Sequence, residues 1–372
     1  MAFSKIATGG LDATLGDEAR PNAKPIIING DMQVNQRGTV TGIATNTYTL
    51  DRWLTEGDDC TITVTKDTDV PTGEGFGASL KMDVTSANGS VSAGDLQIIS
   101  TRLEGQDLQL IKKGTSNAEI ITIAFWVKNS ITGTFIVHLA DDDNSRAVSA
   151  TYTISSANTW EKKVVNIPAD TTGAFGNDAN RSLRIKWYLD AGSDWTSGTL
   201  ATAWASDSNS TRAGGITTGW TTSTSNNFWI TGVQMEVGSY TASTIPPFQH
   251  ESFGDNLTRC QRYFQMFGGD WHGAYSIMYI GSVWSTSQAY IPHPMPTTMR
   301  GNPSFTMGGA LSNFTWQDGN TTGNPTGLAA DQMHENVWVL SVVNSSANFT
   351  DGQAVRCYNN ATAGNFQIDA EL

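Results

Sequence analysis

Short runs of alternating apolar and polar residues recur along most of this chain. Cys60, Ile62 and Val64 share one phase of such a run, and Tyr152 and Ile154 share one phase of another. A period of two residues is typical of a strand with one buried face. Clusters of Gly, Asn, Asp and Ser separate these runs, as turns do in antiparallel sheets. The pattern predicts an all-β fold.

The first two thirds of the chain contain most of the predicted strands. They cover residues 25–28, 48–54, 60–66, 78–84, 96–103, 120–127, 134–139, 147–154, 160–167, 183–189 and 226–238. So many strands without long intervening helices predict two packed antiparallel sheets, a jelly-roll β-sandwich. The one helical signal in this region is 105–113, where Leu108 and Ile111 are three residues apart.

Segment 226–238 has two alternative registers. The apolar residues on its two sides are in opposite phases: Phe228 and Ile230, then Val233, Met235 and Val237. A β-bulge at Gly232 would point both sets toward the core. Without a bulge, Trp229 and Thr231 would point inward together with the three later residues.

Four regions follow from the changes in pattern. Residues 1–25 are weakly patterned and predict an N-terminal attachment arm. Residues 26–245 form the predicted jelly roll, and Pro246 and Pro247 mark its end. Within the linker 246–265 a short amphipathic helix is expected over 253–264, with Tyr263 and Phe264 packing at a domain or subunit interface. Residues 266–372, with strands at 275–280, 287–291, 304–307, 337–343 and 366–370, predict a second, smaller β-sandwich domain.

The amino-acid composition argues against some classes of function. Charged residues make up only 15% of the chain, and the formal net charge is -13. Such an acidic protein does not suit a nucleic-acid backbone, which requires clustered Lys and Arg. The sequence has neither a membrane-spanning apolar run nor a signal peptide, so we expect no membrane partner and no ordinary secretion. Cys60, Cys260 and Cys357 fit neither a disulfide framework nor a zinc site, and we expect buried thiols.

Catalytic and metal signatures are missing from the sequence. It has no nucleophile elbow, phosphate-binding loop or zincin motif, so no catalytic residue and no metal ligand is assigned. Asp141-Asp142-Asp143-Asn144 resembles the start of a calcium loop but lacks its later glycine and glutamate. We interpret it as an acidic hairpin turn. His138 lies in a predicted strand and is expected to be a hydrogen-bonded structural residue.

Twelve tryptophans suggest sugar-binding surfaces, because pyranose faces stack on aromatic rings while hydroxyls bind amides and carboxylates. The first candidate set lies in the long loop 191–227: Trp195, Trp204, Trp220, Asp194 and Asp207, with Asn226. The second set lies in the C-terminal region: Trp271, His272, Tyr275 and Trp316. The alternative, which we favour, is that these rings pack against the sandwich or between subunits.

Several motifs together resemble fibre and tail-associated structural proteins of tailed bacteriophages, particularly marine ones. They are INGDM at 28–32 with NQR at 35–37, YxxDRW at 48–53, IxFWVK at 123–128, YxISSANTW at 152–160, ITGVQMEVG at 230–238 and RCQRYF at 259–264. As an ordered set they cover roughly residues 26–265. The pattern MRxNP at 299–303 is similar to one in the terminal domains of such proteins.

The resemblance implies a virion location and a homotrimer. It also implies a central domain similar to jelly-roll carbohydrate-binding modules, many of which hold a structural calcium through acidic residues of the closing strand. Here Thr231 and Gly232 replace the usual acidic pair, which leaves Asp31 and Glu236 as the remaining calcium ligands to consider. No other cofactor is expected.

From these observations we expect a non-enzymatic virion protein, similar to a tail fibre. The arm would attach it to other virion proteins, and the β-domains would bind a host-surface glycan. One alternative is a purely structural head-decoration or tail-collar protein. A less favoured alternative is a polysaccharide depolymerase, which would need two suitably separated carboxylates in a groove.

Overall fold

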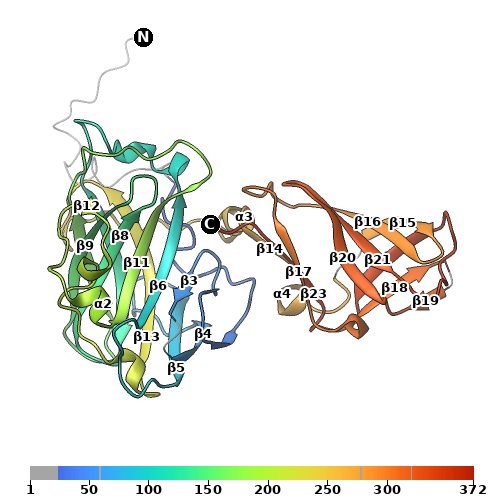
Figure 1. The fold of residues 1–372 in the computed structure, drawn as a ribbon, viewed down its shortest axis with the longest axis horizontal. Helices are drawn as coiled ribbons and strands as arrows, with labels where there is room; N and C mark the ends of the chain where they lie inside the picture. Colours follow the sequence, from blue (N-terminus) through green and yellow to red (C-terminus); the bar gives the residue numbers. More distant parts are fainter. Residues whose placement is uncertain (1–23, 58–59, 277–278, 320) are drawn as a thin grey trace, which may run out of the picture.

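The computed structural model describes residues 24–57, 60–276, 279–319 and 321–372. Strands dominate it, and they form two sandwiches arranged end to end along the long axis (Figure 1). The expected fold class, a jelly-roll β-sandwich followed by a short helix and a second, smaller β-sandwich, is confirmed. The arm predicted over residues 1–25 falls almost entirely outside the described residues.

Two antiparallel sheets form the first sandwich. Sheet A has the order β1-β4-β5-β13-β7-β10, and sheet B has the order β12-β9-β8-β11-β6-β3-β2. The strands of sheet A are β1 (Val40–Ile43), β4 (Thr61–Asp67), β5 (Ser79–Ser86), β7 (Ile121–Asn129), β10 (Glu161–Ile167) and β13 (Asn227–Val237). Those of sheet B are β2 (Thr47–Tyr48), β3 (Leu54–Glu56), β6 (Leu96–Glu104), β8 (Gly133–Asp141), β9 (Arg146–Ile154), β11 (Arg181–Ala191) and β12 (Ala205–Ser206).

One apolar core fills the space between these sheets. The ring of Trp187 lies 5.6 Å from that of Trp53 and 5.7 Å from that of Phe125, measured between centroids. All three side chains are almost completely buried. Rings of this size contribute much of the apolar area that a sandwich removes from water.

The bulge at Gly232 is confirmed. The register between β13 and β7 shifts between Thr231 and Gln234, and Gly232 has φ +60°. Ile230 and Val233, from the two opposite phases, are both buried in the core. A side chain at Gly232 would also collide with the ring of Phe76, which lies 2.5 Å from the Cβ position.

Two local predictions in this domain were wrong. Residues 25–28 form no strand, although Ile27 and Ile28 are buried. Residues 48–54 form two short strands around a turn, in which Arg52 has φ +71°. The helical signal at 105–113 corresponds to two 3-10 turns, Gly105–Asp107 and Gln109–Ile111. The acidic hairpin turn after Asp141 is confirmed, because it joins β8 to β9.

A smaller sandwich follows the helix α3 (Phe253–Gln261). Sheet C has the order β14-β23-β17, and sheet D has the order β19-β18-β22-β15-β16-β21-β20. Their strands are β14 (Phe264–Gly268), β15 (Tyr279–Ser285), β16 (Gln288–Pro294), β17 (Ser304–Gly308), β18 (Phe314–Asp318), β19 (Thr321–Gly323), β20 (Gly327–Met333), β21 (Val337–Val343), β22 (Ala354–Asn359) and β23 (Asn365–Asp369). Two further helices are single turns, α2 (Ser193–Thr196) and α4 (Gly269–His272). The strand predicted at 275–280 was misplaced, because β15 begins at Tyr279.

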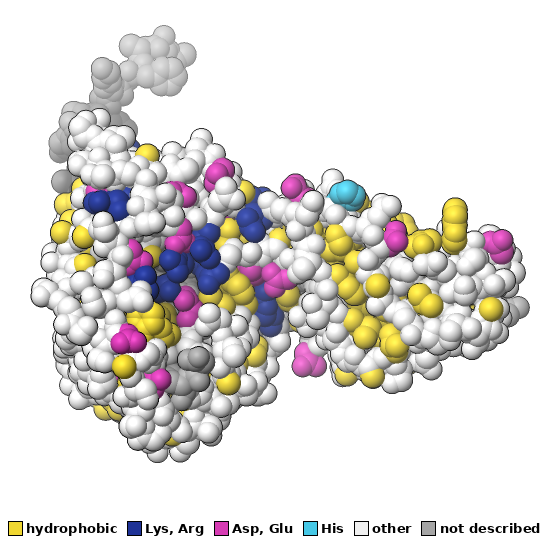
Figure 2. All heavy atoms as spheres, viewed as in Figure 1, with side chains coloured by type: hydrophobic (Ala, Val, Ile, Leu, Met, Phe, Trp, Pro, Cys, Tyr) yellow, Lys and Arg dark blue, Asp and Glu magenta, His cyan; other side chains and the backbone are white. Residues whose placement is uncertain are grey.

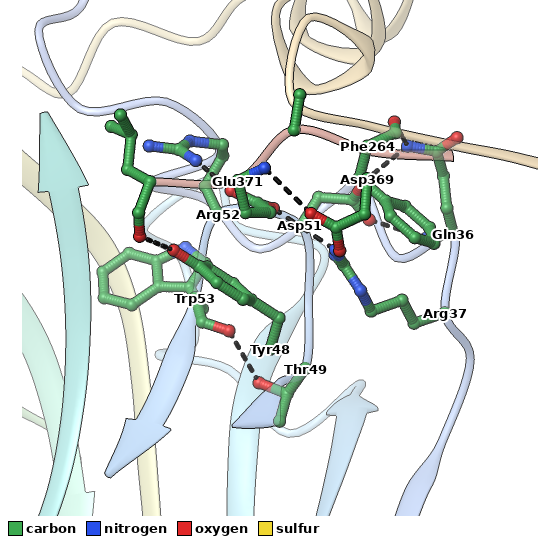
Figure 3. Close-up of polar contacts among 12 residues, drawn as sticks. Gln36, Arg37, Tyr48, Thr49, Asp51, Arg52, Trp53, Phe264, Asp369 and Glu371 are labelled. Atoms are coloured by element: carbon green, nitrogen blue, oxygen red, sulfur yellow. Dashed lines mark hydrogen bonds and ion pairs between the residues drawn. The ribbon is translucent and has the colours of Figure 1, made fainter. Parts of the chain in front are cut away.

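Residues 370–372 return to the first sandwich and form a junction with it (Figure 3). Glu371, whose side chain is 3% exposed, forms an ion pair with Arg52 and another with Arg37 at 3.4 Å. The guanidinium of Arg52 lies 3.5 Å from the ring centroid of Tyr263, and that of Arg37 lies 3.5 Å from the ring of Phe264. Tyr263 and Phe264 are therefore buried between the two domains.

A further ion pair joins the helix end to sheet B. Arg262 binds Glu104 in a bidentate arrangement, with Nε at 2.9 Å and Nη2 at 2.8 Å from the two carboxylate oxygens. The Glu104 side chain is 0% exposed, whereas that of Arg262 is 31% exposed. Burial works to raise the pKa of Glu104, but the hydrogen bonds from Arg262 outweigh it and lower that pKa.

The three cysteines and His138 are buried, as the sequence predicts. Cys60, Cys260 and Cys357 are buried, and no disulfide joins them. His138 is buried in β8 with Nδ1 2.9 Å from the Ser149 hydroxyl, which confirms its structural role. Within the described ranges, no helix is long and apolar enough to cross a membrane.

Candidate functional site

The outer face of sheet B carries an unusual set of polar side chains. Along β11, Leu183, Ile185 and Trp187 point into the core, so Arg184, Lys186 and Tyr188 point outward. Register pairs Arg184 with Arg102, Lys186 with Ser100 and Tyr188 with Ile98 on β6. The alternation of two neighbouring strands therefore places basic side chains next to each other on one face.

The long segment after β11 covers one half of this face. It is tied to the sheet by backbone hydrogen bonds, from Ser149 to the Ala201 carbonyl and from Thr217 to the Thr134 carbonyl, both at 2.7 Å. Beneath it lies a small apolar cluster: Ile98, Ile136, Tyr188, Ala191 and Ala213, with Trp195, Leu200 and Ile216 at its edge. This half is closed to ligands.

Asp190 holds the end of the covering segment. This carboxylate is buried at the end of β11 and accepts hydrogen bonds from the backbone N–H of Gly219 at 3.0 Å and of Thr221 at 2.9 Å. The Thr221 hydroxyl donates a further bond at 2.9 Å. The segment is thus anchored by a charge-assisted network.

The other half of the outer face is basic, and we call it the basic face. Its cations are Arg102, Arg181, Arg184, Lys186 and Arg212. Lys and Arg side chains gather visibly over β6 and β11 (Figure 2). These five cations are accompanied by three carboxylates. Lys186 binds Glu56, Arg212 binds Asp207 and Arg184 binds Asp142, each at 2.6 Å, while Arg181 binds Asp142 as well. The face is therefore positive, although the chain carries a net charge of -13.

The ionised state of these groups follows from their surroundings. Burial works to raise the pKa of Asp207, but the hydrogen-bonded Arg212 outweighs it and lowers that pKa. Burial likewise opposes ionisation of Glu56, and Lys186 overcomes it, so the pKa of Glu56 is lowered. Burial lowers the pKa of His138 to about 3, so this histidine is neutral at pH 7. The positive charge therefore comes from arginine and lysine side chains, although burial lowers the pKa of Lys186.

The guanidinium groups of the basic face are partly exposed. The Nε atoms of Arg102 and Arg184 are buried and have no hydrogen-bond partner among the described residues. Arg102 Nη1 donates a hydrogen bond to the main-chain oxygen of Leu372. The side chains of Arg184 and Arg212 remain 22% and 20% exposed. Guanidinium groups present a planar fork that binds carboxylates and sulfates in a bidentate manner, so this face suits an anionic ligand.

The sequence-predicted residues of the first set are dispersed over this region. Trp195 and Asp207 both contact Arg212, whose guanidinium carbon is 5.5 Å from the Trp195 ring centroid. Asp194 is exposed beside Trp195 in α2. Trp204 is half-buried elsewhere, bonded through its indole N–H to the Pro168 carbonyl at 2.9 Å. Two members are buried: Trp220, at 0% exposure, and Asn226.

The second set lies on the other domain. Trp271 and His272 are neighbours in α4, and the Trp271 ring contacts exposed Phe253. Tyr275 is 59% exposed, and its ring lies 5.9 Å from that of Tyr358. Trp316 is 2% exposed and belongs to the core of the second domain. The structure therefore brings only part of each predicted set to the surface.

The calcium implied by the resemblance does not fit the residues present. Asp31 is buried, accepts a hydrogen bond from Asn256 at 3.2 Å, and lies 4.0 Å from His250. Among the described residues, no group of three or more His, Cys, Asp or Glu side chains is placed to hold a metal ion.

Comparison with known proteins adds distant likenesses only. No protein-family model matches the chain, and no curated protein matches it significantly. Among solved structures, the enzymatically active domain of tailspike protein 4 from bacteriophage CBA120 is 16% identical, with a TM-score of 0.31, over 57% of this chain and 21% of that one. The module TmCBM61, solved with beta-1,4-galactotriose, is 11% identical with a TM-score of 0.28, over 58% of this chain and 99% of that one. A family 11 carbohydrate-binding module from Clostridium thermocellum is 8% identical with a TM-score of 0.27, over 57% of this chain and 98% of that one.

The aligned part spans about a fifth of the tailspike chain and nearly all of each module. The fold is accordingly assigned from the sheet topology of this chain itself.

Sequence reasoning missed the basic face. Its members are at positions 102, 181, 184, 186 and 212, which lie in three separate segments of the sequence. The one available signal was the alternation Arg184-x-Lys186 within a predicted strand, which places two cations on one face.

Proposed function

We propose that this chain is a structural protein of a phage virion that binds an acidic glycan through its basic face. The observation that carries the binding half of this proposal is the excess of cations on one open sheet face of an acidic protein. The virion half is supported by the motif resemblance over residues 26–265. A homotrimer held to the particle by the arm 1–25 belongs to the same proposal.

Binding would use the arginine forks directly. The partly exposed guanidinium groups of Arg102 and Arg184 would bind carboxylate or sulfate groups of successive sugars, and the partly exposed ring of Trp195 would border the site. A hydrogen bond to a charged group contributes about 1.5–3 kcal/mol, so each guanidinium would raise affinity roughly 10- to 100-fold. Several copies on one particle would add avidity without further contacts.

The test compares a polyanion with its neutral form. Polygalacturonate and its methyl ester are titrated against the full chain and against the double variant Arg102→Gln/Arg184→Gln. We expect the full chain to bind the acid and not the ester, with affinity falling as salt rises. The double variant should lose at least about tenfold in affinity, and Arg102→Lys/Arg184→Lys should retain part of it because it keeps the charge.

Three outcomes would contradict the proposal. Equal binding of acid and ester would remove the electrostatic argument. Absence of any glycan or cell binding, with loss of particle stability when the gene is deleted, would assign a purely structural role in head decoration or a tail collar. Release of reducing sugar from host polysaccharide would show an enzyme.

A further inference from the structure

The outer face of sheet D exposes large side chains at the far end of the second domain. Along β15, Val283 points into the core, and Ile280, Ser282 and Trp284 alternate outward. Ile280 is 73% exposed and Trp284 is 72% exposed. Side chains of this size are usually mostly buried, and adjacent exposed ones commonly mark a binding surface.

Neighbouring strands extend this surface into a continuous strip. Register pairs Ile280 with Arg356 on β22, and Arg356 with Gln317 on β18. On the other side it pairs Ser282 with Tyr290 on β16. The strip therefore crosses four adjacent strands of one sheet without a change of face.

Aromatic rings stand at both ends of this strip. At one end the Trp284 and Tyr290 rings are 6.4 Å apart and inclined at 69°. At the other end is Tyr358, two residues beyond Arg356 on β22, with Tyr275 beside it. Trp284 is four residues beyond Ile280 in the opposite direction, so the two ends are about 20 Å apart at the usual rise of a strand.

A hollow of about 210 Å³ lies between these ends. It is lined by Ile280, Gln317, Gly319, Ala354, Val355 and Arg356. Hydrogen-bonding groups in and beside it include the Gln317 amide, the Arg356 guanidinium and the Ser282 hydroxyl. No carboxylate belongs to the described lining.

The charge pattern identifies the class of ligand. Arg356 is the one ionised group of the strip, and its Nε already donates to the Gln317 Oε1 at 3.0 Å, while its guanidinium carbon lies 5.5 Å from the Tyr358 ring. An anion would find a single, already engaged cation, and a cation would find no partner in the strip. Uncharged sugars suit it, because their C–H faces stack on rings and their hydroxyls bind amide and guanidinium groups.

We propose that this strip binds an uncharged oligosaccharide that spans from Tyr358 to Trp284. The site lies on a different domain from the basic face and shares no residue with it. The strip on the second domain would therefore bind neutral sugar chains, and the basic face on the first domain would bind acidic groups. Failure of either site would leave the other intact.

The experiment titrates neutral oligosaccharides of increasing length, from disaccharide to hexasaccharide, in the β-1,4-glucan, xylan and galactan series. Binding to the full chain is followed by calorimetry and by the fluorescence of exposed Trp284. We expect affinity for at least one series to rise with length until both ends are engaged. Trp284→Ala and Tyr358→Ala should each lower hexasaccharide affinity about tenfold and abolish most of the length dependence.

Matched controls separate this site from its surroundings. Phe253→Ala removes another exposed ring, 50% exposed, outside the strip and should bind as the full chain does. Arg102→Gln/Arg184→Gln should also leave neutral binding unchanged. Equal affinity of Trp284→Ala and the full chain, or no binding in any of the three series, would overturn the proposal. A drop in sedimentation mass on Trp284→Ala without any sugar binding would overturn it too, and would assign the strip to self-association.

Discussion

The Glu104–Arg262 pair at the domain junction gives an asymmetric prediction. Arg262→Gln leaves a carboxylate with a fully buried side chain without its bidentate cation, whereas Glu104→Gln leaves a guanidinium that is 31% exposed and can be hydrated. Removing one partner of a buried pair costs about 3–5 kcal/mol when the remaining charge stays buried. We expect Arg262→Gln to lose about 3 kcal/mol and Glu104→Gln about 1 kcal/mol.

The pH dependence of this loss has a definite sign. Although burial opposes ionisation of Glu104, Arg262 lowers its pKa in the folded protein. The pair therefore contributes stability above the unfolded pKa of about 4.3, and this stability is lost as pH falls through the lower folded value. In Arg262→Gln burial is opposed more weakly, by the hydrogen bond from Gln106 at 2.6 Å among others, so protonation of Glu104 relieves much of the penalty. The difference in the free energy of unfolding between Arg262→Gln and the unmodified chain should shrink by more than half between pH 7 and pH 4.

Guanidinium unfolding followed by tryptophan fluorescence measures both quantities, since Trp53 and Trp187 lie in the core of the first domain. For a domain of about 200 residues, 3 kcal/mol corresponds to a melting temperature roughly 6–12 °C lower. Asp369→Asn is the control, because this carboxylate is 39% exposed in its pair with Arg37 and should cost little. Equal losses in Arg262→Gln and Glu104→Gln at pH 7, or a gap that does not change with pH, would refute the reasoning.

Three further predictions concern single buried groups. His293 is buried against Trp338 at 4.3 Å with no hydrogen-bond partner for either ring nitrogen among the described residues, and burial lowers its pKa to about 3. Because the pKa of His293 is lower in the folded protein, stability is lost as pH falls below about 6.5. His293→Phe should add about 1 kcal/mol to the free energy of unfolding at pH 7. It should also weaken the pH dependence of the melting temperature between pH 7 and pH 4. Gly232→Val should cost about 2–3 kcal/mol in denaturant unfolding, because it combines a positive φ with a collision against Phe76, whereas Gly89→Val, in open space, should cost little. Asp190→Asn should cost about 2 kcal/mol and speed hydrogen exchange at 219–222, because an amide cannot accept all the bonds that the carboxylate does; unchanged exchange there would contradict this role.

Alternation predicted the sandwich because it is a local signal of a half-buried strand. Residues 337–343, 60–66 and 147–154 were placed within a residue or so for that reason. Tyr48 and Arg52 misled it, because their partners lie on residues 263 and 371–372, far away in sequence. The strands β18 and β22 were missed because their outward residues include Gln317 and Tyr358, whose polarity does not contrast clearly with the core residues between them.

The candidate sites were harder to predict than the fold. Trp220 and Trp316 occur among polar residues, as ligand-binding aromatics do, yet both are core residues. Conversely, Trp284 belongs to neither predicted set and lies between the predicted strands 275–280 and 287–291. Whether a ring is inside or outside depends on the phase of its strand, and whether cations from three elements meet depends on register. Neither quantity is encoded locally.

The pairing of β14 with β23 has a consequence for how this chain can be rebuilt. Phe264 and Asp369 are direct neighbours in sheet C, so the chain enters and leaves the second domain at one point. Arg262 and Glu371 make the main ionic contacts with the first domain, and both lie outside residues 264–369. The second domain could therefore be exchanged as a unit. A hairpin or an unrelated domain could replace it while Arg262 and Glu371 keep their contacts with the first domain. Binding specificity could then change without redesign of the first domain.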